Sequence, residues 1–139
     1  MGIFHEVRMI RPATMQDVPR IIDMIGRLVV SVNGPQRADR LWTGETLARL
    51  IHDPRGVVLV SGGGFIAGCI SETVISPAPV AIELGWYAED RSGLALLRAF
   101  ETWAEGQGAT LVKMTCNGGG AQRILERSGY RIAEIQMVK

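Results

Sequence analysis

One stretch decides the fold: residues 82–97, IELGWYAEDRSGLALL. Its first half is largely apolar and predicts a strand, whereas apolar residues recur at helical spacing from Leu94 to Trp103. Residues 91–93 (RSG) predict a tight turn between the two, with the helix beginning at Ser92 or Gly93. The N-terminus of that helix presents unpaired backbone N–H groups, and the positive end of the helix dipole, to the space beyond the strand. The sequence therefore predicts an anion site there.

The composition indicates a single globular domain spanning residues 1–139. The chain is 47% hydrophobic, which is enough apolar material for one core. Fifteen basic and fourteen acidic residues give a net charge of +1 without a basic cluster, so neither nucleic acid nor an anionic membrane is an expected partner. His5, Glu6 and Arg8 stand where a signal peptide needs an apolar run, and no stretch has the roughly 18 apolar residues of a membrane helix. We therefore expect a cytoplasmic protein.

The cysteines and histidines show no spacing typical of a metal or nucleophilic site. Cys69 and Cys116 lack C-x-x-C spacing and neighbouring histidines, which disfavours both a disulfide framework and a zinc site and predicts free thiols. His5 and His52 are far apart and are interpreted as structural. No acid or histidine accompanies Cys116, so a nucleophilic mechanism is not expected.

The remaining chain predicts alternating strands and helices. Thr14 with Asp17 resembles a capping box at the start of the first helix, although Pro19 fits better if Asp17 is itself the cap. The glycine triplet at residues 62–64 joins two apolar runs and predicts a hairpin turn rather than a phosphate loop. The other expected elements are strands at 7–10, 57–60, 65–70, 109–114 and 130–138, a first helix ending at 33–35, a second capped by Thr43, and a last one capped by Asn117 that begins properly near Ala121.

Three motifs, in order along the chain, resemble the GNAT superfamily of N-acetyltransferases. Trp86 and Ala88 take the Val and Pro positions of the family's strand. Arg91, Gly93 and Ala95 match the loop that follows, with one residue missing between the Arg and the first Gly. The opening I-R-P-A-T-x-x-D at residues 10–17 and the ending N-x-x-x-A-x-x-x-L-x-x-x-G-Y at residues 117–130 are also similar to the family's pattern.

The resemblance implies an α/β (α+β) fold of the GNAT type. This is a central mixed, mostly antiparallel twisted sheet flanked by helices, with a strand pair that splays at the cofactor site. It also implies binding of acetyl-CoA, with the strand at residues 84–88 meeting the pantetheine arm and the loop amides meeting the pyrophosphate. The residues that inherit cofactor binding are Trp86, Tyr87, Ala88, Arg91, Ser92, Gly93, Leu94, Ala95, Asn117 and Arg123.

Several of these residues also have a purely structural interpretation. Gly93 can simply permit a tight strand-to-helix turn, and Asn117 can simply cap the last helix. Trp86 and Tyr87 can line an acceptor groove or be ordinary core and surface aromatics. The neighbouring residues 89–90 (ED) are expected to form a solvated acidic turn.

Glu83 is the candidate general base. It interrupts an apolar strand, and half-buried surroundings raise the pKa of a carboxyl towards the range of a working base. Alternation with its neighbours in residues 82–86 also allows an ordinary solvent-facing residue. The resemblance implies a tyrosine as general acid in the last helix, but Leu125 stands at that position, and Tyr130 is expected to pack and not to catalyse.

The expected function is acetyl-CoA-dependent transfer of an acetyl group to a primary amine by direct attack, with a small-molecule or peptide acceptor. One alternative is a catalytically weak or inactive CoA-binding module that acts as a sensor or partner-binding protein. A second is a structural domain that does not bind CoA. The resemblance also allows a homodimer, through pairing of the apolar C-terminal strand.

Overall fold

The computed structural model describes residues 9–139 and contains one five-stranded sheet in the order β1-β2-β3-β4-β5. The strands are β1 (Arg11–Pro12), β2 (Gly56–Val60), β3 (Gly64–Ser71), β4 (Val80–Ala88) and β5 (Leu111–Lys113). Neighbouring strands from β1 to β4 are antiparallel, and β5 pairs with β4 in parallel. The sheet is therefore mixed and mostly antiparallel, as predicted.

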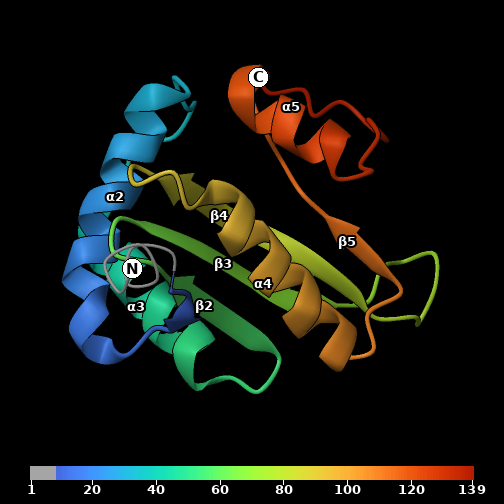
Figure 1. Cartoon of the computed structure of the whole chain (residues 1–139), viewed down its shortest axis with the longest axis horizontal. Coiled ribbons are helices and arrows are strands. Elements are labelled where there is room, and N and C mark those ends of the chain that lie inside the picture. The colour runs from blue at the N-terminus through green and yellow to red at the C-terminus, as the bar shows by residue number, and fades with distance from the viewer. Residues whose placement is uncertain (1–8) are drawn as a thin grey trace.

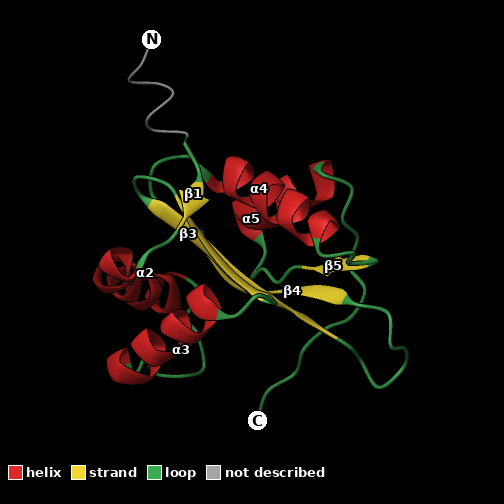
Figure 2. Cartoon of the chain, turned by 90° about the horizontal axis from the view of Figure 1, so that it is seen from below, coloured by secondary structure: helices red, strands yellow, loops and turns green. Residues whose placement is uncertain are grey.

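Helices cover both faces of the sheet. They are η1 (Met15–Asp17), α2 (Val18–Ser31), α3 (Arg40–His52), α4 (Gly93–Gly106) and α5 (Gly119–Arg127). Figures 1 and 2 show α2 and α3 on one face and α4 and α5 on the other. Alternation along β3 divides the core accordingly, since Phe65 packs with the α2 side and Ile66 with the α4 side. Within residues 9–139, no helix combines the length and the apolar character needed to cross a membrane.

The helix starts agree with the sequence in part. The backbone N–H of Thr14 donates to the Asp17 carboxylate at 2.8 Å, which confirms the capping box. Asp17 also stands at the N-cap position of α2, but its side chain makes no capping bond there. The prediction of Thr43 as the cap of the second helix is wrong. Asp39 accepts from the N–H of Trp42 at 3.0 Å, and this carboxylate cap starts α3 three residues earlier.

Two predictions towards the C-terminus are wrong, and the strand expected at 7–10 is tested only in part. The last helix begins at Gly119 with Gly118 at its N-cap position, so Asn117 does not cap it. Residues 130–139 form no strand, because this apolar segment has no strand beside it to supply backbone partners among the described residues. Of the strand expected at 7–10, residues 7 and 8 lie outside the described part, while Met9 and Ile10 precede β1 without joining it. His5 also lies outside the described residues.

A register shift between β3 and β4 marks the centre of the sheet. Ala67 pairs with Gly85 and Gly68 with Glu83, which leaves Leu84 as an extra residue in β4. Gly68 must lack a side chain, because a Cβ there would lie 2.5 Å from the ring of Phe100 on α4. This close approach brings α4 onto the sheet next to the bulge, which contains Leu84 and adjoins Glu83.

Candidate functional site

The strands β4 and β5 part in the middle of β4. Their pairing is Val80 with Leu111, Ala81 with Val112 and Ile82 with Lys113, and it stops there. From Glu83 to Ala88, the edge of β4 that faces β5 has no strand partner among the described residues. This is the splayed pair predicted from the sequence, and it leaves backbone N–H and C=O groups available to a ligand.

Glu83 lies at the point where the two strands separate. Its side chain is almost enclosed, since the residue is only 6% exposed. Oε1 accepts a hydrogen bond from the N–H of Thr115 at 2.8 Å and another from the Thr115 hydroxyl at 2.7 Å. Oε2 has no hydrogen-bond partner within residues 9–139. Every fully enclosed polar side-chain atom in that part of the chain does have a partner, so Oε2 is not fully enclosed and retains contact with solvent. One carboxylate oxygen is therefore fixed and the other is free to meet a ligand.

The surroundings of Glu83 favour its protonated form more than water does. Burial raises the pKa of the Glu83 carboxyl, and the two hydrogen bonds from Thr115 oppose that change without cancelling it. A carboxyl with a raised pKa can take up a proton closer to neutral pH. The position and the direction of the shift suit the predicted role as base, which stays a prediction.

Beyond the open edge, the chain turns into the N-terminus of α4. Ser92 is at the N-cap position, and no side chain caps the first turn. Leu96 N–H bonds to the Ser92 carbonyl, but the N–H groups of Gly93, Leu94 and Ala95 have no hydrogen-bond partner among the described residues. These three amides and the helix dipole form an anion site of the predicted kind.

The turn before α4, residues 89–92, is held from inside by Asp90. Its carboxylate accepts from Gly63 N–H at 2.8 Å, from the Ser61 hydroxyl at 2.9 Å, and from both the N–H and the hydroxyl of Ser92. Burial by itself would raise the pKa of Asp90, but these hydrogen bonds outweigh it and lower the pKa. The prediction of a solvated acidic turn is therefore wrong for Asp90. The prediction is correct for Glu89, which is exposed and pairs with Arg27 at 2.7 Å.

The same network changes what Ser92 and Arg91 can offer. Ser92 is 1% exposed, and its N–H already donates to Asp90, so neither its side chain nor its amide faces the anion site. Arg91 is exposed and has a φ of 63°, a left-handed conformation that lets the chain turn within the shortened loop. Its guanidinium carries a fixed positive charge beside the start of α4.

The two aromatic residues of β4 lie on opposite faces of the sheet. Trp86 packs on the α4 side, and its Nε1–H donates to the carbonyl of Gly93 at 3.0 Å, which fixes the first turn of α4. Tyr87 packs on the α2 side. Ala88 lies with Trp86 on the α4 side. Trp86 therefore serves as a wall of the site, whereas the ring of Tyr87 belongs to the other face.

The last helix brings two further residues to the neighbourhood. Asn117 donates to the carbonyl of Val32 at 2.8 Å, which ties the start of α5 to the end of α2. Arg123 is exposed on α5, and its guanidinium reaches back towards Gly120. Ile124 of the same helix packs near Gly93. The helix α5 thus forms a second wall, opposite the N-terminus of α4.

The position of the expected general acid holds a buried hydrocarbon. Leu125 is enclosed, and it offers no proton. Tyr130 donates its hydroxyl proton to Glu101 on α4 at 2.8 Å, and burial together with this carboxylate raises the pKa of the phenol. Tyr130 thus packs between α5 and α4, as predicted.

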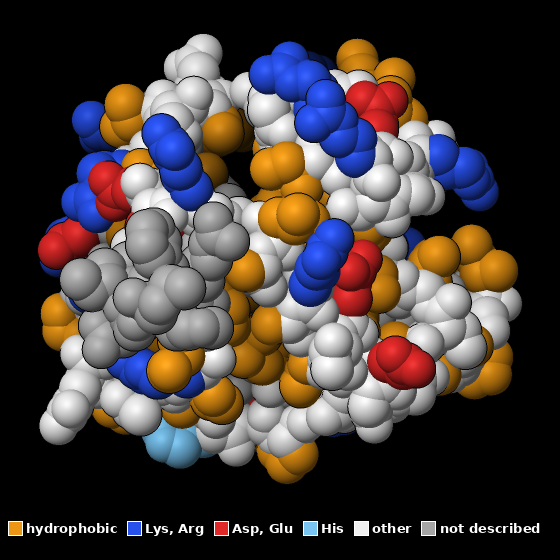
Figure 3. All heavy atoms as spheres, in the orientation of Figure 1, with side chains coloured by type: hydrophobic (Ala, Val, Ile, Leu, Met, Phe, Trp, Pro, Cys, Tyr) orange, Lys and Arg blue, Asp and Glu red, His pale blue; other side chains and the backbone are white. Residues whose placement is uncertain are grey.

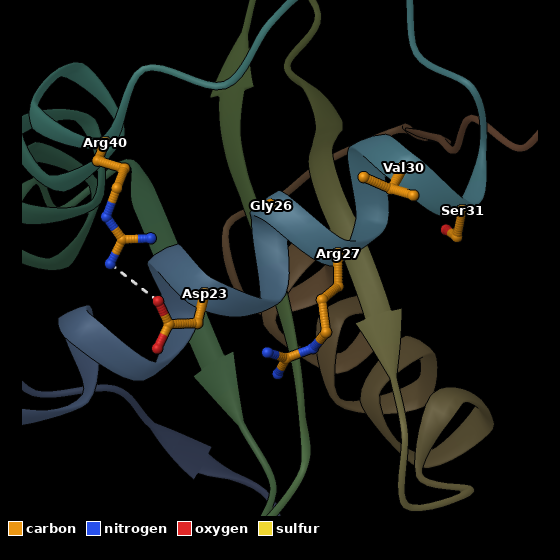
Figure 4. Close-up of a pocket in the computed structure, with 6 residues that line it drawn as sticks. All are labelled: Asp23, Gly26, Arg27, Val30, Ser31 and Arg40. Atoms are coloured by element: carbon orange, nitrogen blue, oxygen red, sulfur yellow. Dashed lines mark hydrogen bonds and ion pairs between the residues drawn. The ribbon is translucent and has the colours of Figure 1, made fainter.

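Figure 3 shows a hollow on the face that carries α4 and α5, between the end of α2 and α5, with hydrophobic side chains on its wall and Lys or Arg side chains nearby. A second hollow, of about 510 Å³, lies along the outer face of α2. Its three charged lining residues are already paired, since Arg40 reaches Asp23 at 2.8 Å (Figure 4) and Arg27 pairs with Glu89. That second hollow does not include β4 or the start of α4, so we do not regard it as the reactive site.

No protein-family model and no curated protein matches the sequence. Solved structures do match. Glucosamine-6-phosphate N-acetyltransferase from Arabidopsis thaliana is 14% identical, with a TM-score of 0.72 over 94% of this chain and 96% of that one. The chain has the GNAT fold.

Other proteins with this fold match over similar lengths. An aminoglycoside acetyltransferase from an uncultured soil metagenomic sample, solved in complex with sisomicin, is 19% identical, with a TM-score of 0.62 over 94% of this chain and 92% of that one. A transcriptional regulator from Bacillus halodurans is 16% identical, with a TM-score of 0.78 over 94% and 97%. At these identities the comparisons establish the GNAT fold and leave the activity to be argued from the site.

Of the residues at this GNAT-fold site, Thr115 was missed from the sequence and Asp90 was assigned a different environment. Thr115 lies 32 residues after Glu83, and nothing local links the two. Asp90 did carry a signal, because an Asp two residues before a Ser commonly accepts from that backbone N–H. The same spacing also occurs in exposed turns, so only the fold shows that Asp90 points inwards.

Proposed function

We propose that this protein is an acetyl-CoA-dependent N-acetyltransferase that acts on a primary amine. The observation that carries the proposal is the open edge of β4 beyond Ile82, which leads directly to the unpartnered amides of Gly93, Leu94 and Ala95. CoA suits this arrangement, because its extended pantetheine arm carries amides that can bond to a strand edge and its pyrophosphate can bind at a helix N-terminus.

The residues present fit that molecule. A Cβ built on Gly93 would meet only Trp86 and Ile124, at 3.8 and 3.9 Å, so this wall is close but not blocked. Arg91 precedes the start of α4 and Arg123 lies on α5, and both are exposed cations that can attract the phosphates. When bound, acetyl-CoA supplies an acetyl thioester that the amine attacks directly, so that a C–N bond forms while the C–S bond breaks and its electron pair leaves on sulfur.

The remaining chemistry is the removal of a proton from the amine and the protonation of the thiolate. Glu83 Oε2 can accept the proton that the amine loses, directly or through water. Leu125 cannot protonate the departing thiolate. A thiol pKa near that of cysteine permits the thiolate to leave unprotonated and to take its proton from water, so we expect slow turnover rather than none.

Binding is tested by the stability of the full chain. CoA at 100 times its dissociation constant should raise the free energy of unfolding by about 2.7 kcal/mol. Acetyl-pantetheine, which lacks the pyrophosphate, should stabilise much less. Gly93→Val should weaken CoA binding with the core intact, because the added side chain would take up space between the backbone of residue 93 and the walls formed by Trp86 and Ile124. A melting curve that CoA leaves unchanged at millimolar concentration would contradict the proposal.

Turnover separates the enzyme from its alternative. Release of free thiol from acetyl-CoA in the presence of a panel of primary amines should exceed release without them. CoA binding without amine-dependent release, for every amine tried, would instead identify an inactive CoA-binding module. The substitution of Leu125 for the usual tyrosine is the observation that keeps this alternative in view.

A further inference from the structure

An apolar groove lies on the opposite face of the sheet from α4. It is bounded by α2, α3 and the central strands and has a volume of about 270 Å³. Of its twelve lining residues, only Thr43 and Thr46 are polar, and none is charged. Two large side chains at the groove, Trp42 and Leu84, are exposed to water. Such a surface gains free energy when an apolar group covers it.

The groove lies next to the candidate base, Glu83, along β4. Leu84 and Gly85 line it, and they directly follow Glu83 in β4. The bulge accounts for this arrangement, because the extra residue turns Leu84 towards the groove while Glu83 bonds across to Thr115. Because β5 no longer pairs with β4 beyond Ile82, the edge of residues 83–85 has no strand partner, and this short segment borders both faces of the sheet. A molecule whose nitrogen lies at Glu83 can therefore place its substituent in the groove.

We infer that this groove binds the substituent of the acceptor, and that the preferred acceptor is a primary amine carrying a neutral, apolar group of about the size of an aromatic ring. The inference rests on the proposed function. Size supports it, because an apolar cavity of about 150 Å³ already accommodates benzene.

Charge supports it as well. No carboxylate in the lining could pair with a second ammonium group, and the Arg49 guanidinium lies 5.5 Å from the centre of the Trp42 ring, which adds a positive charge at the rim. Polyamines and aminoglycosides, which carry several positive charges, would be repelled there. Hydroxyl-rich sugars would find only two threonine hydroxyls. The groove therefore favours an aromatic or aliphatic amine over these classes.

The test compares 2-phenylethylamine with spermidine, using the full chain saturated with CoA. We expect 2-phenylethylamine to bind at least about tenfold more tightly by calorimetry, and to be acetylated with a correspondingly higher kcat/KM. Leu84→Glu should weaken the binding of the uncharged analogue 2-phenylethanol by at least about tenfold, because a charge then lines the groove and the ligand has no ammonium group to pair with it. Leu84 is 55% exposed, so this variant should fold, and Leu84→Ser provides a second, uncharged change. Ile75→Glu is the matched control, since Ile75 is 93% exposed and lies outside the groove.

The outcomes separate the inference from the proposed function. If neither amine is acetylated but 2-phenylethanol, which has no amine, binds and loses affinity in Leu84→Glu and not in Ile75→Glu, the groove stands as a binding site and catalysis fails. If spermidine is acetylated as well as or better than 2-phenylethylamine, the proposed function stands and the inference is overturned. Equal affinities for 2-phenylethanol in the wild type and both Leu84 variants would also overturn it.

Discussion

At the scale of single residues, the decisive group is a carboxylate that the fold has almost enclosed. Glu83 has one oxygen fixed by both donors of Thr115 and the other in contact with solvent. Burial raises its pKa, and Thr115 limits the rise. A base needs both properties, because it must be ionised at the working pH and still hold a proton once it has taken one.

Glu83→Gln should lower kcat by roughly 10²–10⁴-fold and leave CoA affinity nearly unchanged, because the carboxylate acts on the amine. The wild-type rate should rise with pH as Glu83 ionises, at a pH above the ordinary range of a glutamate, and this limb should vanish in the variant. Stability should not fall at neutral pH. A folded-state pKa that is raised means that stability is lost as pH rises through that pKa, and glutamine removes the buried charge. Wild-type rates at every pH would make Glu83 a structural residue.

Thr115→Val should move the same limb to higher pH. The hydroxyl bond lowers the pKa of Glu83, so its loss lets the pKa rise further, while the backbone N–H of residue 115 still donates. Thr115→Ser keeps the hydroxyl and is the control. The pH profiles of kcat/KM for the three proteins decide the matter, and equal profiles would remove Thr115 from the positioning of the base.

At the scale of elements, the start of α4 depends on a contact with the β2–β3 turn. Asp90 joins the two, because its carboxylate accepts from Gly63 and Ser61 on one side and from Ser92 on the other. The carboxylate of Asp90 is occupied by these donors, so it holds the turn in place and leaves the amides of Gly93, Leu94 and Ala95 unpartnered among the described residues. The short loop is thus kept in one conformation by a side chain from within.

Asp90→Asn should lower the free energy of unfolding by about 1–3 kcal/mol and weaken CoA binding, because one oxygen becomes an N–H group that faces other donors. The pKa of Asp90 is lowered, so its contribution is present above the ordinary aspartate pKa and is lost as pH falls through the lower folded value. Glu89→Gln is the matched control, since its exposed pair with Arg27 should contribute only about 0–1 kcal/mol. Urea unfolding and CoA titration of both variants test this, and similar losses in the two would contradict it.

At the scale of the whole molecule, one polar network runs from β1 to α4. Asp17 pairs with Arg11 at 2.8 Å and with Arg20 at 3.2 Å. Arg20 in turn donates to the carbonyls of Ser61 and Gly62, in the turn that holds Asp90. The N-terminal half of the chain is therefore coupled to the loop before α4 by hydrogen bonds as well as by the shared sheet.

Asp17→Asn should lower the free energy of unfolding at pH 7 by about 1.5–3 kcal/mol, because a nearly enclosed carboxylate loses charge-assisted bonds. The Arg11 guanidinium holds the pKa of Asp17 well below its usual range. Its contribution is therefore complete above the ordinary aspartate pKa and fades as pH falls through the folded value. Urea unfolding at pH 7 and pH 3 should show a smaller difference between wild type and variant at pH 3. In Asp23→Asn, whose exposed pair with Arg40 is the control, the loss should be about 0–1 kcal/mol.

The expected homodimer stays a prediction. The open outer edge of β5 and the large exposed apolar side chains of residues 130–139 are the features on which such a contact would rest. Light scattering of the full chain gives the mass that decides it.

The sequence by itself determined the strand, turn and helix from Ile82 to Gly106, the β2–β3 hairpin and the long first helix. Each of these follows from apolar periodicity and from local turn chemistry, which act over a few residues. The three ordered motifs were enough to indicate the GNAT fold and to single out Glu83. The boundaries set by caps were less certain, because Asp39 and Thr43 are both good capping residues and packing chose between them.

Only the tertiary structure decided the contacts that join distant segments. The hydrogen bonds of Glu83 with Thr115, of Asp90 with Gly63 and of Asn117 with Val32 join residues 27 to 85 positions apart. The groove beyond Leu84 lies between separate elements. The prediction of a closing strand at residues 130–138 was wrong for the same reason. Apolar residues show that a segment would suit a sheet, but a strand forms only where an edge with free N–H and C=O groups lies beside it, and that depends on how the whole chain is packed.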